Sequence, residues 1–141
     1  MSIEDRPHGT SLFLLRCVVG IIFTAHGAQK LFGAFGGPGL QSTAAMFGQM
    51  GFRPGMFWGA LVGCTELLGG LGLLAGYCTR LAALGLAITM AVAILKVHWP
   101  HGLFAQNGGC EYPLTLLVVN LVIICSGAGP VSLDARRSQK T

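Results

Sequence analysis

Four ionisable residues stand inside long apolar stretches of this sequence, where such groups are costly. Arg16, His26 and Lys30 belong to the first stretch, and Glu66 lies at the centre of the second. At about 100° per residue, the three basic residues fall within roughly 80° of one helix face. A lone carboxylate in hydrocarbon stays protonated, whereas a carboxylate paired with a cation can ionise. We therefore expect Glu66 to pair with Arg16 or His26, either as a static clamp between helices or as a proton-handling pair.

A second group of polar residues follows the third apolar stretch and opens the fourth. Lys96 and His98 close the third stretch, His101 lies just beyond it, and Glu111 and Tyr112 open the fourth. The two histidines and Glu111 could ligate a metal. However, a proline breaks their helical spacing and no CxxC or HExxH motif accompanies them, so no metal site is predicted. We expect instead a pocket near one membrane surface, with an apolar wall, that suits an amphipathic ligand such as a quinone.

The composition places these residues in lipid. Of 141 residues, 52% are hydrophobic and 10% are charged, against about 25% charged residues in soluble domains. This excludes an ordinary soluble globule and a disordered chain. The basic residues behind the net charge of +4 are scattered, which argues against nucleic-acid binding. The five cysteines form no CxxC pair and predict no disulfide framework.

Four stretches are long and apolar enough to cross a hydrocarbon core, which takes roughly 17 to 25 helical residues. They are residues 11–32, 56–76, 81–97 and 112–128. The sequence therefore predicts an all-α membrane protein, a four-transmembrane-helix bundle that forms one domain over residues 1–141. Glycines such as Gly59, Gly63 and Gly70 in the second stretch favour close helix packing.

The distribution of basic residues predicts the orientation. An even number of spans puts both ends of the chain on one side, and the larger share of Lys and Arg, including a basic tail at 130–141, falls on that side. The positive-inside rule then makes both termini cytoplasmic. The first outer loop begins with a glycine-rich turn at 33–39, followed by an uncharged segment at 43–50. We expect a short interfacial helix there, either an apolar flap over the bundle or an ordinary packed loop.

The polar residues lie within short stretches that follow one another along almost the whole chain. These stretches are RCVVGIIF at 16–23, HGAQKLFG at 26–33, FGGPG at 35–39, ELLGG at 66–70, TRLAA at 79–83, VH at 97–98, EYPL at 111–114 and SLD at 132–134. As an ordered set they resemble the DoxX family of small four-helix bacterial membrane proteins. His26, Lys30, Glu66, His98 and Glu111 match the family's polar positions, but the match brings no catalytic roles.

The resemblance implies a link to membrane redox chemistry, because a related polypeptide is a subunit of thiosulfate:quinone oxidoreductase and other members are associated with oxidative stress. We predict a quinone-facing subunit of an oxidoreductase in the bacterial inner (plasma) membrane, with the quinone headgroup near the outer leaflet. In this hypothesis Glu66 and His26 are catalytic. The ligand-binding residues are Lys30, His98, Glu111 and Arg16.

No covalently bound cofactor is predicted, because the sequence has no CxxCH, flavin or iron–sulfur signature. Electrons would then come from a protein redox partner. The alternative is a non-catalytic membrane anchor or assembly protein for a redox complex, in which the polar residues only hold the bundle together. A small-solute transporter is less favoured, since four short helices without inverted half-repeats leave a narrow path. The sequence is compatible with a homo-oligomer.

Overall fold

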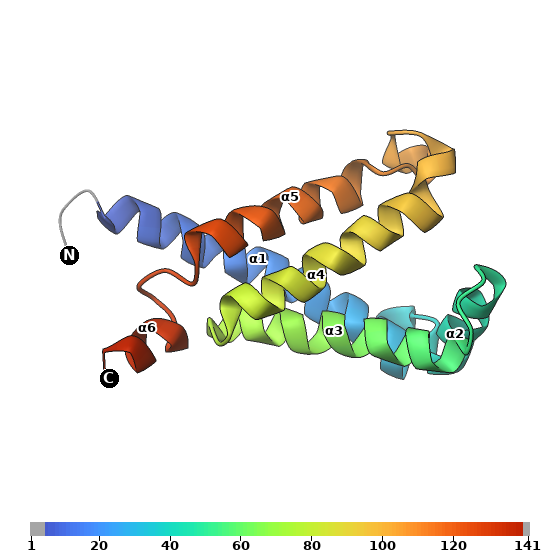
Figure 1. Cartoon of the computed structure of the whole chain (residues 1–141), viewed down its shortest axis with the longest axis horizontal. Helices are drawn as coiled ribbons and strands as arrows, with labels where there is room; N and C mark the ends of the chain where they lie inside the picture. Colours follow the sequence, from blue (N-terminus) through green and yellow to red (C-terminus); the bar gives the residue numbers. More distant parts are fainter. Residues whose placement is uncertain (1–4, 140–141) are drawn as a thin grey trace.

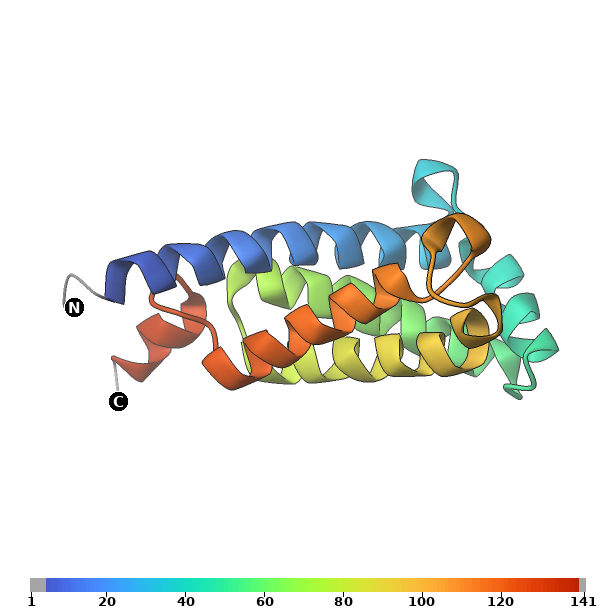
Figure 2. The same cartoon turned by 90° about the horizontal axis from the view of Figure 1, so that it is seen from above.

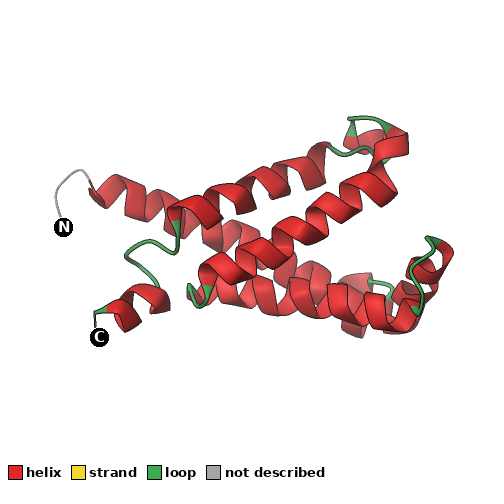
Figure 3. Ribbon diagram, viewed as in Figure 1, coloured by secondary structure: helices red, strands yellow, loops and turns green. Residues whose placement is uncertain are grey.

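The chain is an all-helical protein in the part that the structure, a computed structural model, describes: residues 5–139, with side chains from residue 9. Every regular element in that range is helical (Figure 3). The α-helices are α1 (Asp5–Phe32), α2 (Gly39–Gln49), α3 (Gly55–Ala75), α4 (Thr79–Ala93), α5 (Glu111–Ser126) and α6 (Leu133–Ser138). The short helical turns are η1 (Ala34–Gly36), η2 (Ile94–His98), η3 (Trp99–His101) and η4 (Ala105–Asn107).

Three helical segments are long and apolar enough to cross a membrane, namely Gly9–Phe32, Gly55–Ala75 and Thr79–His101. They correspond to the first three predicted spans. α5 matches the fourth predicted stretch but has 16 residues, or about 24 Å of helix, which is less than the ~30 Å of a typical hydrocarbon core. A helical membrane protein is therefore confirmed, while the fourth crossing stays a prediction.

The long helices α1, α3, α4 and α5 run roughly along one direction, with α1 packed on α3 and α5 packed on α4 (Figures 1 and 2). α1 begins near α6 at one end of the molecule, here named the inner end. α2 and the turns η2 to η4 lie at the opposite, outer end (Figure 1). The buried core between the helices contains Val19, Phe23, Leu73, Ala83, Leu86, Met90, Leu116 and Ile123. Which side of a membrane each end faces stays a prediction.

Glycines bring α1 and α3 into close contact, as the sequence predicted. A Cβ added at Gly70 would lie 2.5 Å from the backbone nitrogen of Thr24. Gly27 likewise faces the backbone of Leu67, and Gly63 faces the side chain of Leu31. The two helices therefore run antiparallel: as residue numbers rise along α1, the numbers of the α3 residues that face them fall. This antiparallel register fixes which polar residues can meet.

The first outer loop contains the expected short helix, but it starts earlier than predicted. α2 begins at Gly39, directly after Pro38, rather than at residue 43, and a proline commonly precedes or opens a first helical turn. The buried Thr43 hydroxyl donates to the carbonyl oxygen of Lys30 at 3.2 Å. This bond ties α2 to the outer end of α1.

Packing between aromatic rings also holds α2 against α3. The ring of Phe52 lies 5.6 Å from that of Phe47 on α2 and 5.8 Å from that of Trp58 on α3, measured between centroids. Tilted aromatic pairs at such distances are favourable. α2 is thus packed against the outer end of the bundle.

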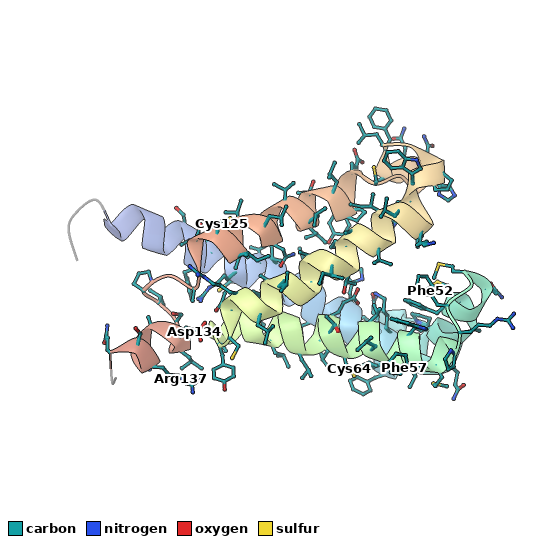
Figure 4. The ribbon with its side chains drawn as sticks, viewed as in Figure 1. Phe52, Phe57, Cys64, Cys125, Asp134 and Arg137 are labelled. Atoms are coloured by element: carbon teal, nitrogen blue, oxygen red, sulfur yellow. The ribbon has the colours of Figure 1, made fainter. Side chains whose placement is uncertain are left out.

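The basic segment after α5 folds back onto the inner end. The Asp134 carboxylate accepts hydrogen bonds from the backbone N–H groups of Cys78 and Thr79, both at 2.9 Å, and so caps the start of α4. Figure 4 shows Asp134 beside the turn that joins α3 to α4. The Arg137 guanidinium lies 5.4 Å from the ring centre of Tyr77. The predicted tail therefore contains a docked helix.

Burial alone would raise the pKa of Asp134. The hydrogen bonds from Thr79 and Cys78, together with the positive charge of Arg137, outweigh burial and bring the pKa below its ordinary value of 3.8. Asp134 is therefore an ionised cap at neutral pH.

Candidate functional site

A cavity of about 730 Å³ lies in the outer half of the bundle. Its walls come from α1, α3, α4 and α5, and α2 with the loop behind it contributes Met46, Phe47, Met50 and Phe52. In Figure 4, Phe52 lies at the outer end, on the side of α2 and α3 that faces α4. The uncharged segment of this loop thus forms part of the wall of the cavity. Most of the lining is apolar, and the ionisable lining residues are His26, Lys30, Glu66, Lys96, His98 and Tyr112.

The central polar feature of the cavity is an ion pair between α1 and α3. The Lys30 ammonium donates to the Glu66 carboxylate, with Nζ 2.6 Å from Oε2. The Glu66 side chain is 3% exposed and the Lys30 side chain 21%. A carboxylate this deeply buried is stable as an anion only beside a cation or several donors. Lys30 supplies that charge and stays open to the cavity.

The predicted pairing of Glu66 with Arg16 or His26 is wrong, and the helix register gives the reason. Because Gly27 lies against Leu67, the level of Glu66 on α3 corresponds to residue 28 of α1. Arg16 is twelve residues from that level, or about 18 Å along the helix, too far for any side chain. Lys30 is two residues away and carries a long, flexible side chain. His26 is equally near in level, but it lines the cavity one turn below Lys30 instead of bonding Glu66.

Arg16 belongs to the inner end and not to the cavity. Its side chain is fully buried, and Nη2 donates to the carbonyl oxygen of Val131 at 2.7 Å. Nε and Nη1 have no hydrogen-bond partner among the described residues. The expectation that Arg16 contacts the same ligand as Lys30 therefore has no support in this geometry. Arg16 instead attaches the segment before α6 to α1.

Lys96 and His98 belong to η2, which follows α4 directly, and line the cavity from the far side. The Nδ1 atom of His98 lies 2.7 Å from the carbonyl oxygen of Gly108. A carbonyl can only accept, so Nδ1 carries the proton and Nε2 is left to bond elsewhere. Tyr112, at the start of α5, lines the cavity beside them.

Glu111 lies outside the cavity, although the sequence grouped it with the ligand-binding residues. Its Oε1 atom accepts a hydrogen bond from the backbone N–H of Ala105 at 2.7 Å and so fixes the loop that carries η4. His101 is also outside, with Nδ1 bonded to the carbonyl of Val97 at 3.0 Å. Among the described residues, no three His, Cys, Asp or Glu side chains gather as metal ligands would.

Sequence reasoning missed the aromatic contribution to this site. Phe52 and Trp58 both line the cavity, and no pattern used in the sequence analysis assigns either of them to the site. Asn120 on α5 is completely buried, and its Nδ2 donates to the carbonyl of the lining residue Leu116 at 2.8 Å. Its Oδ1 atom has no protein partner in the described structure. The sequence shows that Asn120 is a polar residue inside an apolar stretch. It does not show how deeply the side chain is buried.

Comparison with known families matches the DoxX family model to residues 11–99 of this chain. The chain belongs to the DoxX family. The matched region includes most of α1 and all of α3 and α4, with His26, Lys30, Glu66 and His98, and it ends before Glu111 and α5. The resemblance inferred from the sequence is therefore confirmed.

Two relatives extend the similarity beyond that region. "Putative oxidoreductase CatD" of Bacillus subtilis (strain 168) is 29% identical over 121 residues, covering 86% of this chain and 82% of the relative. "Uncharacterized membrane protein Rv3486" of Mycobacterium tuberculosis is 30% identical over 141 residues, covering 92% and 83%. No solved structure matches the chain. This DoxX-family protein is thus an integral membrane protein that is similar, along most of its length, to a protein named as an oxidoreductase.

Proposed function

We propose that this DoxX-family protein is the quinone-facing membrane subunit of an oxidoreductase in the bacterial inner membrane. The observation that carries the proposal is the Lys30–Glu66 ion pair at the wall of a large apolar cavity. The volume of about 730 Å³ falls within the ~300–1,000 Å³ range of small-molecule sites. An apolar cavity with a few polar groups suits a flat ring that carries two carbonyl oxygens.

The chemistry of the lining residues fits quinone reduction, in which the ring takes up two electrons and two protons to become a quinol. The Lys30 ammonium, which keeps donors beyond the one given to Glu66, can donate a hydrogen bond to one carbonyl oxygen. Negative charge that develops on that oxygen is stabilised by the ammonium. His26 and Glu66 are the groups that can relay protons to the ring. Glu66, an anion beside Lys30, must accept a proton before it can pass one on. His98, through Nε2, can contact the ligand from the other wall.

In this proposal the electrons come from a partner protein, and the similarity to CatD, named as an oxidoreductase, supports redox chemistry. The headgroup would lie near the outer leaflet, because the cavity occupies the end that the positive-inside rule places outside. The other hypothesis, a non-catalytic anchor or assembly protein, differs in one respect. It expects the cavity to have no redox ligand.

The first test is extraction of lipids from the protein purified in mild detergent, with quinone measured by chromatography. The second is quinone reduction in native membranes that express His26→Gln, Glu66→Gln or Lys30→Met. We expect the first two variants to insert normally and lower turnover, and Lys30→Met to raise the quinone concentration needed for half-maximal rate. His101→Gln is the matched control, since His101 is outside the cavity. Quinone-free protein together with unaltered turnover in all three variants would refute the proposal and favour the anchor hypothesis.

A further inference from the structure

The cavity reaches the lipid-facing surface through a slot between α3 and α4. Among the apolar lining residues of α3 and α4, three are also exposed: Leu61 on α3 at 45%, and Ile88 and Val92 on α4 at 57% and 38%. A side chain that both lines a cavity and meets the outside marks an opening. Figure 1 shows α3 and α4 spreading apart toward the outer end, with α1 behind them.

The helices separate at a definite level. Nearer the inner end, Leu86 of α4 is fully buried against Gly69 of α3, where an added Cβ would lie 2.9 Å from Cγ of Leu86. Gly85 is a cavity-lining residue beside Thr65, with 3.2 Å between its added Cβ and Cγ2 of Thr65. Beyond these residues, the cavity lining on the two helices includes Leu61 and Val62 of α3 and Ile88 and Val92 of α4. Leu86 packed on Gly69 thus closes the inner part of this seam, and the outer part stays open.

We propose that this slot is the exit for the apolar tail of the ligand, an inference that rests on the proposed quinone function. The headgroup lies at Lys30 and Glu66, and the tail leaves between Leu61 and Ile88 to join the acyl chains of the bilayer. The ligand class is then a lipid quinone with a long hydrocarbon tail, rather than a water-soluble quinone. Such a ligand enters and leaves sideways, without passing through water.

The chemistry of the two sides of the cavity supports this route. The slot has hydrocarbon side chains at both edges, so a tail in it loses no hydrogen bonds and remains in contact with apolar atoms. On the side of α1 and α5, the lining includes His26, Lys30 and the exposed Tyr112. An apolar chain passing there would cover polar groups that need hydrogen bonds. The polar side therefore suits the headgroup and the slot suits the tail.

Trp58 gives a direct measure of binding, because it lines the cavity and a bound quinone quenches the fluorescence of a neighbouring indole. In the Trp99→Phe background, Trp58 is the remaining tryptophan. This protein is placed in quinone-free nanodiscs of phosphatidylethanolamine and phosphatidylglycerol. It is then titrated with one benzoquinone headgroup in two forms, without a tail and with a multi-isoprene tail.

The test variant is Leu61→Phe/Ile88→Phe, which fills the slot from both edges. The matched control is Leu68→Phe/Leu84→Phe on the same two helices, since both residues are exposed but do not line the cavity. We expect the slot variant to bind the tailed quinone about tenfold more weakly. The tail-less form should bind with unchanged affinity, and the control variant should bind both quinones like the parent.

The outcomes separate the two proposals. Equal binding of the tailed quinone by the slot variant and the parent would overturn the tail exit and leave the quinone function standing. An equal loss of affinity for the tailed and the tail-less quinone would also overturn the tail exit, because the slot would then be part of the headgroup site. If neither quinone quenches Trp58 in the parent, the proposed function fails and the tail exit fails with it.

Discussion

Nζ of Lys30 lies 2.6 Å from Oε2 of Glu66, and this contact joins the outer part of α1 to the middle of α3. It places a buried negative charge and a partly accessible positive charge at the wall of the cavity. The same pair therefore contributes to the stability of the bundle and to the chemistry of the site. The two contributions can be separated by experiment.

The stability contribution predicts strong coupling between the two residues. Lys30→Met should lower the free energy of unfolding by about 3 kcal/mol, because it leaves the buried Glu66 carboxylate without its partner. Glu66→Met should cost less, because the Lys30 side chain is 21% exposed and its charge stays partly accessible. The double variant should lose less than the sum of the two, since both charges are then gone. SDS titration of the three variants in micelles measures this. Additive losses would contradict a direct pair.

The glycine contact between α1 and α3 predicts a position-specific cost. Gly27→Ala should destabilise the protein by about 1–3 kcal/mol, because its Cβ would meet the backbone of Leu67 and force the helices apart. Gly48→Ala is the control, because Gly48 lies in α2 with no atom within 4 Å of its added Cβ. That change should be neutral or stabilising by up to about 1 kcal/mol. Equal effects on the midpoint of thermal unfolding would contradict the described packing.

Capping by Asp134 predicts both a stability loss and a pH dependence. Asp134→Asn should cost about 1–2 kcal/mol, because an ionised acceptor for two backbone N–H groups at the start of α4 is replaced by a neutral one. A carboxyl whose pKa is lowered by folding stabilises the folded state fully above its ordinary pKa of 3.8. That stabilisation is lost as the pH falls through the lowered pKa.

Thermal unfolding between pH 6 and pH 2.5 compares the wild type with Asp134→Asn. The difference between the two proteins in the midpoint temperature of unfolding should be largest near pH 6 and should shrink as the pH falls toward 2.5. A constant difference across all pH values would show that the cap does not depend on the charge. Limited proteolysis of residues 133–138 gives an independent readout, with faster cleavage expected in the variant.

The predicted orientation can be tested with two cysteines at opposite ends of the molecule. Cys78 is exposed in the turn at the inner end, and Cys110 is partly buried at the outer end, just before α5. In single-cysteine variants, an impermeant maleimide should label Cys110 in intact cells and Cys78 only after permeabilisation. The opposite pattern would invert the orientation of both termini.

The sequence predicts the helices well because their signal is local. Long apolar stretches at 11–32, 56–76 and 81–97 are recognisable one at a time, and the structure has helices there. The polar residues of the cavity were also predictable in part: His26, Lys30, Glu66 and His98 all line it. Each carries an ionisable group in an apolar stretch or at its end, which is uncommon unless the group faces the inside of a bundle.

The pairings were less predictable because they depend on how two helices are aligned. Helical spacing placed Arg16 and Lys30 on one face of α1, but it did not give the register against α3 that puts Lys30 at the level of Glu66. The position of Glu111 depends on a loop that turns its carboxylate toward the backbone of Ala105. The cap by Asp134 likewise joins residues 55 and 56 positions apart. Contacts of this kind follow from the folded chain and not from local patterns.

The bond from Arg16 to the carbonyl of Val131 has a consequence for the order of events during protein synthesis. The acceptor lies 115 residues after the donor, so a ribosome that adds about 5–20 residues per second makes Val131 roughly 6–23 s after Arg16. During this interval the guanidinium of the nascent α1 cannot make this bond. Insertion of α1 and closure of the inner end are therefore separate steps in biogenesis. A nascent chain that stops before Val131 can complete the first step but not the second.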